Sequence, residues 1–139
     1  MKKTFTFICP LSIKLYKKNY ALNLNTYRNL HFNVNNNLKT KFKQYMQDQI
    51  EQCPEFDKPV SIRFKITKDY RKSPQIMDKS NVYSVVTKYL YDAITEAGKW
   101  EDDNDNFIKL EQIMPTNYRE NKKGDLESFI KITITELEE

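Results

Sequence analysis

The sequence predicts an α+β fold, in which two main helices pack on a small mixed β-sheet within a single domain of residues 1–139. Several short segments alternate polar and apolar residues, which is typical of strands with one buried face. Between them lie longer segments whose apolar residues recur every three or four positions, as in helices. With 39% hydrophobic and 30% charged residues, the chain can also bury a core of ordinary size.

The predicted elements follow the order strand, helix, strand, helix, strand, strand. The first strand covers residues 4–8 and ends before Pro10. Residues 12–37 are rich in Tyr, Asn and Lys without a clear period, so we expect a long loop with short ordered pieces. The other elements are a helix over 38–53, a strand over 60–67, a helix over 82–97 that Gly98 ends, and strands over 107–114 and 128–137.

The cysteine and histidine content restricts the chemistry. Cys9 and Cys53 lie far apart and form no CxxC pair, which argues against a thiolate zinc site and a disulfide framework. His31 is the only histidine, which excludes histidine-based metal sites and a Ser-His-Asp triad. A metal would therefore be held by carboxylates, whose hard oxygens favour Mg²⁺ or Mn²⁺.

No apolar run approaches the roughly 20 residues that span a bilayer, so we expect no membrane association. The N-terminal segment lacks a cleavage site of signal-peptide type, and we expect a cytoplasmic protein. The net charge is +4, although the stretch WEDDNDNF (100–107) concentrates four acids. The basic residues therefore lie elsewhere on the surface. They suit an anionic polymer such as DNA, or they serve ordinary solubility.

A polar stripe lies along the second predicted helix. Asn81, Lys88 and Asp92 fall within about 40° of one another at 100° per residue. Asp78 precedes this helix, while Asp102 and Asp103 follow it, so acids flank it at both ends. Other interpretations remain open. In these interpretations, Asp78 or Ser80 only caps the helix, Lys88 and Asp92 only form an exposed ion pair, and the acidic stretch is only a hydrated turn.

The run MDKSNVYSVVTKYLYDAITEAGKWEDDN (77–104) resembles the signature of RusA-type Holliday-junction resolvases, often encoded by phages. That family carries Asp-x-Asp-Asn at a helix start, then Lys, Asp-Ala-Leu, Gly, and Asp-Asp entering a strand. The matching residues here are Asp78, Asn81, Lys88, Asp92-Ala93-Ile94, Gly98 and Asp102-Asp103. The second aspartate of the family is replaced by Ser80, and the helix is longer by about one turn. The likeness covers about residues 60–139.

The resemblance implies a homodimeric, Mg²⁺- or Mn²⁺-dependent endodeoxyribonuclease that resolves four-way junctions in DNA recombination and repair, in the cytoplasm of a bacterial host. The implied catalytic residues are Asp78, Lys88 and Asp103, and the implied metal ligands are Asp78, Asp102 and Asp103. Asn81 and Asp92 support them, and Asp92 holds the Lys88 ammonium. The residues expected to bind DNA phosphates are Lys17, Lys18, Arg28, Arg71 and Lys72.

Two alternatives remain open. In the first, the change to Ser80 has removed cleavage, and the protein keeps the same fold but binds branched DNA or a host protein. In the second, the protein is unrelated to this family and each acid is a cap or a solvated turn. The resolvase hypothesis makes two structural predictions. Asp78 and Asp103 should lie within reach of one ion beside Lys88, and Trp100 and Phe107 should dock in the core and hold the acidic stretch rigid.

Overall fold

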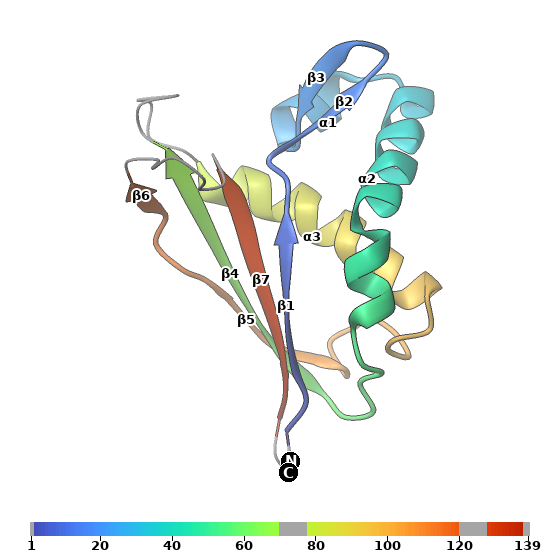
Figure 1. The fold of residues 1–139 in the computed structure, drawn as a ribbon, viewed down its shortest axis with the longest axis vertical. Helices are drawn as coiled ribbons and strands as arrows, with labels where there is room; N and C mark the ends of the chain where they lie inside the picture. The colour runs from blue at the N-terminus through green and yellow to red at the C-terminus, as the bar shows by residue number, and fades with distance from the viewer. Residues whose placement is uncertain (1, 70–77, 120–127, 138–139) are drawn as a thin grey trace.

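Ten helices and strands are found in the parts of the chain that the computed structural model describes, residues 2–69, 78–119 and 128–137. Figure 1 shows their arrangement. They are β1 (Thr4–Cys9), β2 (Ser12–Leu15), β3 (Lys18–Ala21), α1 (Leu24–Asn29), α2 (Phe32–Gln52), β4 (Val60–Asp69), α3 (Lys79–Glu96), β5 (Ile108–Ile113), β6 (Asn117–Arg119) and β7 (Phe129–Glu136).

A five-stranded mixed sheet forms the centre of the fold, with the strand order β1-β7-β4-β5 and with β6 paired to the far end of β4. Strand β7 runs antiparallel to both of its neighbours, while β4 runs parallel to β5 and β6. Strands β2 and β3 form a separate hairpin. The mixed sheet with helices packed on it confirms the predicted α+β class.

The two central strands bury one face each because their apolar residues alternate. Across the antiparallel β4–β7 pair, Ile62 lies opposite Ile134, Phe64 opposite Ile132 and Ile66 opposite Ile130. All six side chains are buried. Since opposite residues in a ladder point to the same face, the six form one continuous apolar surface.

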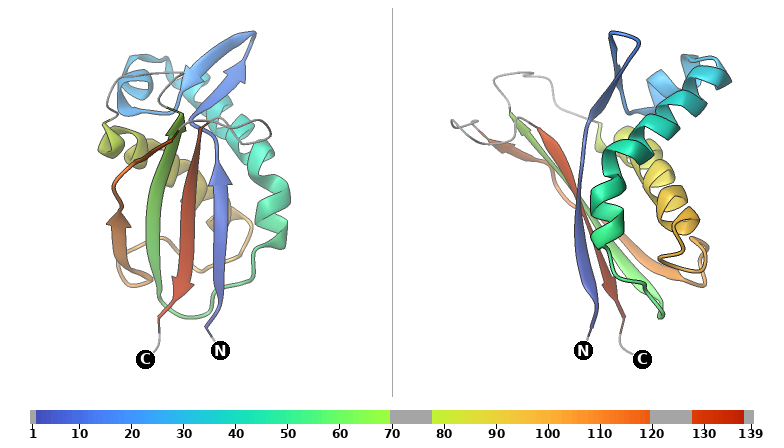
Figure 2. Two further views of the ribbon diagram at one scale, coloured as in Figure 1. Left: turned by 60° about the vertical axis from the view of Figure 1, so that its left-hand side comes forward. Right: turned by 45° about the vertical axis from the view of Figure 1, so that its right-hand side comes forward.

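Helices α2 and α3 cover this apolar surface and leave the other face of the sheet open, as the right-hand view of Figure 2 shows. From α2 the buried residues are Leu38, Phe42, Met46 and Ile50, the face that the predicted helix period indicates. From α3, Val82, Val86, Leu90 and Ile94 are among those buried. Within the described ranges, no helix combines the length and the apolar character needed to cross a bilayer.

The predicted long loop over residues 12–37 is wrong in part, because this segment holds the β2–β3 hairpin, α1 and the first turns of α2. The hairpin turns at Tyr16 and Lys17, whose φ angles are 52° and 66°. Side chains begin both helices: the Asn23 Oδ1 accepts from the Thr26 N–H at 2.9 Å, and the His31 Nδ1 accepts from the Asn33 N–H at 3.2 Å. Local capping and turn chemistry therefore order a segment without hydrophobic periodicity.

Candidate functional site

The loop between α3 and β5, residues 97–107, carries the acidic stretch and begins with a defined helix end. Gly98 has a φ of 74°, and its N–H donates to the Thr95 carbonyl at 3.0 Å. The Lys99 N–H donates to the Ile94 carbonyl at 3.1 Å. These two bonds are those of a helix end in which glycine adopts the left-handed conformation, as Gly98 predicts. The loop therefore leaves α3 in a fixed direction.

Aromatic packing then anchors both ends of the acidic stretch. Trp100 is 3% exposed and packs edge to face with Tyr91 and with Phe107, at ring-centroid distances of 5.4 and 5.8 Å. Its Nε1–H donates to the Thr95 Oγ1 at 2.6 Å. Phe107 is partly buried against the same core. This confirms the prediction that Trp100 and Phe107 dock in the core on either side of the acids.

Between these anchors the loop satisfies its own polar groups. The Asp103 N–H donates to the Asp102 Oδ1 at 2.8 Å, and the Asn104 side-chain amide donates to the Asp102 Oδ2 at 3.0 Å. The Asn106 N–H donates to the Asn104 Oδ1 at 2.9 Å. Both oxygens of Asp102 thus accept bonds from the turn itself. This geometry is that of an exposed turn held by its own hydrogen bonds, which agrees with the turn interpretation of the acidic stretch.

The carboxyl of Asp103 interacts with two other acids, Asp102 of the same turn and Asp92 of α3. Partial burial raises the pKa of its carboxyl above the usual range, and a hydrogen bond to the Asp102 carboxyl and the negative charges of Asp102 and Asp92 raise it further. Asp92 of α3 therefore lies close enough to interact with the loop. Among the residues that the structure describes, however, no three acidic, histidine or cysteine side chains are grouped to hold a metal ion.

The raised pKa of Asp103 gives a pH-dependent stability. The folded state binds this proton more tightly than the unfolded state, so the stabilisation is present at low pH and is lost as pH rises through the raised pKa. In metal-free buffer at pH 7, we expect Asp103→Asn to have a higher free energy of unfolding than wild type, because it removes the repulsion. The gain should be only a few tenths of a kcal/mol, since Asp103 is largely exposed. Below about pH 4 the difference should vanish.

Urea unfolding at several pH values measures this difference. Asp105→Asn, which removes another exposed acid of the same loop, is the matched control and should show a smaller difference. A variant Asp103→Asn that is less stable than wild type at pH 7 would contradict the proposed repulsion among Asp92, Asp102 and Asp103.

Asp78 lies at the opposite end of α3 from the acidic loop, which corrects the prediction that it meets Asp103 within one chain. It is the N-cap residue of α3, yet its side chain makes no capping hydrogen bond. Asp92, with which Asp103 interacts, lies almost four turns further along, roughly 20 Å at the rise of an α-helix. A single ion bridges only a few ångströms. Asp78 and Asp103 of one chain therefore do not share an ion.

The predicted contact between Lys88 and Asp92 is also absent. The Asp92 Oδ2 instead pairs with the Lys39 Nζ of α2 at 2.8 Å. Glu96, one turn further along α3, pairs with Lys43, one turn further along α2, so the two ion pairs connect the helices. Lys88 is exposed and makes no ion pair or hydrogen bond with the described part of the chain. Its ammonium is free to meet an anion one turn before Asp92.

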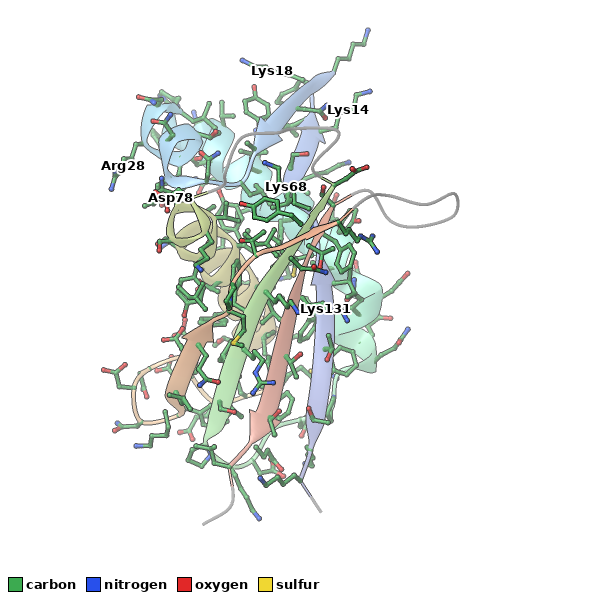
Figure 3. All side chains as sticks on the ribbon, turned by 90° about the vertical axis from the view of Figure 1, so that its left-hand side faces the viewer. Lys14, Lys18, Arg28, Lys68, Asp78 and Lys131 are labelled. Carbon is green, nitrogen blue, oxygen red and sulfur yellow. The ribbon has the colours of Figure 1, made fainter. Side chains whose placement is uncertain are left out.

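The predicted DNA-binding residues that the structure describes gather at the end of the molecule where α3 begins. Lys17 and Lys18 lie at the tip of the β2–β3 hairpin, and Arg28 lies in the last turn of α1. Figure 3 shows Lys18, Arg28 and Asp78 at this same end. Asn81 lies half-buried in the first turn of α3. Arg71 and Lys72 lie outside the described residues.

Glu111 of β5, an exposed residue, contacts α3 in a way that the sequence pattern alone did not indicate. Its carboxylate accepts hydrogen bonds from the hydroxyls of Tyr83 and Tyr91, two turns apart on α3. Burial, together with Glu111, raises the pKa of both tyrosines. Glu111 lies opposite Ile62 in the sheet register, so it points toward the helices. The tyrosine spacing on one helix face was the available signal.

A search against models of known protein families finds no match to this chain, and a search of curated protein sequences finds none either. The site is therefore defined by its geometry. Asp78 begins α3 at the end of the molecule that carries Lys18 and Arg28. Toward the other end of the helix, Asp92 interacts with Asp103 of the acidic loop, and the exposed Lys88 lies one turn before Asp92.

Proposed function

We propose that the protein is a structure-specific endodeoxyribonuclease that acts on four-way DNA junctions, as the resemblance to RusA-type resolvases implies. The observation that supports this most is the position of Asp78. Its carboxylate makes no capping bond, and it lies at the end of the molecule where hairpin and α1 residues such as Lys18 and Arg28 gather. A carboxylate that holds the metal ion for phosphodiester cleavage has to lie where phosphates bind.

The local structure of the segment behind the resemblance supports the same proposal. A helix begins directly after Asp78, Gly98 ends it in the left-handed conformation, and the acidic pair Asp102-Asp103 leads toward β5. This is the helix, turn and strand that the resemblance implies. Lys88 and Asp92 lie on one side of α3 because they are four residues apart. An added helical turn does not change the side on which they lie.

The described residues of a single chain do not fit a metal ion, since they provide no group of three ligands. Aspartate oxygens are nevertheless the ligands that Mg²⁺ and Mn²⁺ prefer. We therefore propose that the active form is a homodimer, in which Asp78 of one protomer approaches Asp103 of its partner. A two-fold dimer of this kind has two equivalent sites, as paired cuts in a two-fold junction require. Lys88 is the cation proposed to neutralise phosphate charge beside Asp103.

A second candidate function is favoured by a specific observation. Ser80, which stands where the family has its second aspartate, donates no carboxylate, and one chain assembles no group of three ligands among its described residues. A protein with this fold that binds branched DNA, or a protein of a bacterial host, without cutting is consistent with both facts. In either case the proposed place of action is the bacterial cytoplasm, where phage DNA recombines.

The deciding experiment incubates the protein with end-labelled four-way junctions and with linear duplex of the same sequence, in Mg²⁺, in Mn²⁺ and in EDTA. For the resolvase we expect paired symmetrical cuts in the junction only, and only with a metal. The variant Ser80→Asp restores the family's second acid. If it cuts while wild type only binds, the second candidate is correct. If none of these proteins cuts or prefers the junction over the duplex, both the resolvase and the branched-DNA form of the second candidate are rejected, and only binding to a host protein is left.

A further inference from the structure

The face of the sheet that no helix covers carries a group of exposed cations at its centre, with no exposed acid among the described residues beside them. We call it the open sheet face, and its centre consists of Arg63 and Lys65 of β4, Lys131 and Thr133 of β7, and Thr6 of β1. All three cations are exposed. None of them makes an ion pair or a hydrogen bond with a described residue. The outward positions next to them in β1, β4, β5 and β7 hold Thr, Ser, Gln, Ile, Leu or Phe. The outward acid of β4, Asp69, is buried at the far end of the strand, four residues beyond Lys65.

The arrangement of the cations is unfavourable for the folded protein by itself. Lys65 lies directly opposite Lys131 in the antiparallel register, where like charges repel and destabilise the sheet. Arg63 follows on the same face of β4, two residues away. A sheet face that only needs to be soluble can alternate acids and bases across its strands, which stabilises the sheet. Grouping cations alone on this face calls for an anionic partner.

Hydroxyl groups lie beside these charges in a regular row. The hydroxyls of Thr6 and Thr133 are hydrogen-bonded across β1 and β7 at 3.0 Å, and those of Thr4 and Thr135 at 3.1 Å. Each pair uses one donor, so the second hydroxyl hydrogen of each pair is available to an acceptor. Lysine, arginine and threonine side chains are the groups that bind nucleic-acid phosphates and sugars without reading bases.

We infer that the open sheet face binds the phosphate backbone of a DNA duplex, such as one arm of the junction. Figure 3 looks onto this face and shows Lys131 on the sheet. It also shows Lys14 and Lys18 on the hairpin beyond the upper end of the sheet, so further cations lie at the end of the molecule where α3 begins. A second copy of the chain is a poor occupant, because two such faces would bring like charges together. The inference takes from the proposed function only the identity of the polyanion as DNA.

The test compares two triple variants that both lower the net charge from +4 to +1. The first, Arg63→Gln/Lys65→Gln/Lys131→Gln, neutralises the open sheet face. The control, Lys41→Gln/Lys58→Gln/Lys99→Gln, removes three cations that lie outside that face. Binding to a fluorescent 30-base-pair duplex and to a four-way junction is measured by anisotropy at several salt concentrations, in EDTA so that no cleavage occurs.

We expect the open-face variant to bind at least tenfold more weakly and to lower the slope of log Kd against log salt by about 2.7, or 0.9 for each lost phosphate contact. The control should bind almost as wild type does. The open-face variant should also melt at the same temperature or higher, since it removes the Lys65–Lys131 repulsion. Equal weakening by both variants would show that only net charge matters and would overturn the inference. Weaker binding by the open-face variant alone would support it even if wild type does not cut DNA.

Discussion

Mixing the Asp78→Asn and Asp103→Asn proteins is expected to restore nicking of a four-way junction that neither variant cuts alone. Each variant by itself should lose roughly 10²-fold or more of metal-dependent cleavage, because a catalytic metal supplies several kcal/mol and each 1.4 kcal/mol is about tenfold. Asp→Asn keeps the shape of the side chain, and the basic residues remain. Junction binding in EDTA should therefore stay close to wild type.

The reason for recovery is the separation of the two acids along α3. If each site takes Asp78 from one protomer and Asp103 from the partner, a mixed dimer has one intact site and one site without either acid. Random exchange makes about half of the dimers mixed, so roughly a quarter of all sites are intact. Such a dimer cuts one strand. We therefore expect nicked junctions to accumulate without paired cuts.

Gel electrophoresis of junctions labelled on each strand separates nicked from fully resolved products. In the matched control, Asp105→Asn takes the place of Asp103→Asn. Asp105 is an exposed acid of the same loop, and the Asp105→Asn variant by itself should cut as wild type does. If both acids acted within one chain, every mixed dimer would have two damaged sites and no nicking would return. That result would reject the shared site while leaving the nuclease itself in place if wild type cuts.

The fold could be predicted where local patterns coincide with burial. Residues 60–66 alternate strictly, and the apolar residues of α3 recur at three and four, so β4 and α3 were predictable. The first turns of α2 were not, because three of the four asparagines there are exposed and a His31 side chain begins the helix. Strand β6 has three residues, too few for any periodicity to show.

The candidate site was predictable only in its local parts. Gly98 and the aromatic anchors of the loop act on neighbouring residues, and the structure confirms both. Helical periodicity places Asn81, Lys88 and Asp92 on one side of a helix, but it does not bring an acid from one helix end to the other. Lys39, the actual partner of Asp92, lies on another helix and more than fifty residues away, where no sequence period reaches.

Trp100→Ala is expected to destabilise the protein by about 3–5 kcal/mol, a large part of the stability of a typical domain. The indole is 3% exposed and fills the space between Tyr91 and Phe107. Its removal leaves a cavity and leaves the Thr95 hydroxyl without the indole N–H. The acidic loop also loses the anchor at its start, so Asp102 and Asp103 should lose their fixed position.

Trp100→Phe separates packing from the hydrogen bond, because it keeps an aromatic ring in the core and removes the N–H donor. We expect it to cost about 1–2 kcal/mol, clearly less than the alanine variant. Urea unfolding followed by far-ultraviolet circular dichroism measures both variants without relying on the fluorescence of the lost tryptophan. A loss below about 1 kcal/mol for Trp100→Ala would mean that the loop is held by Phe107 and its own turn bonds, and that the indole does not anchor it.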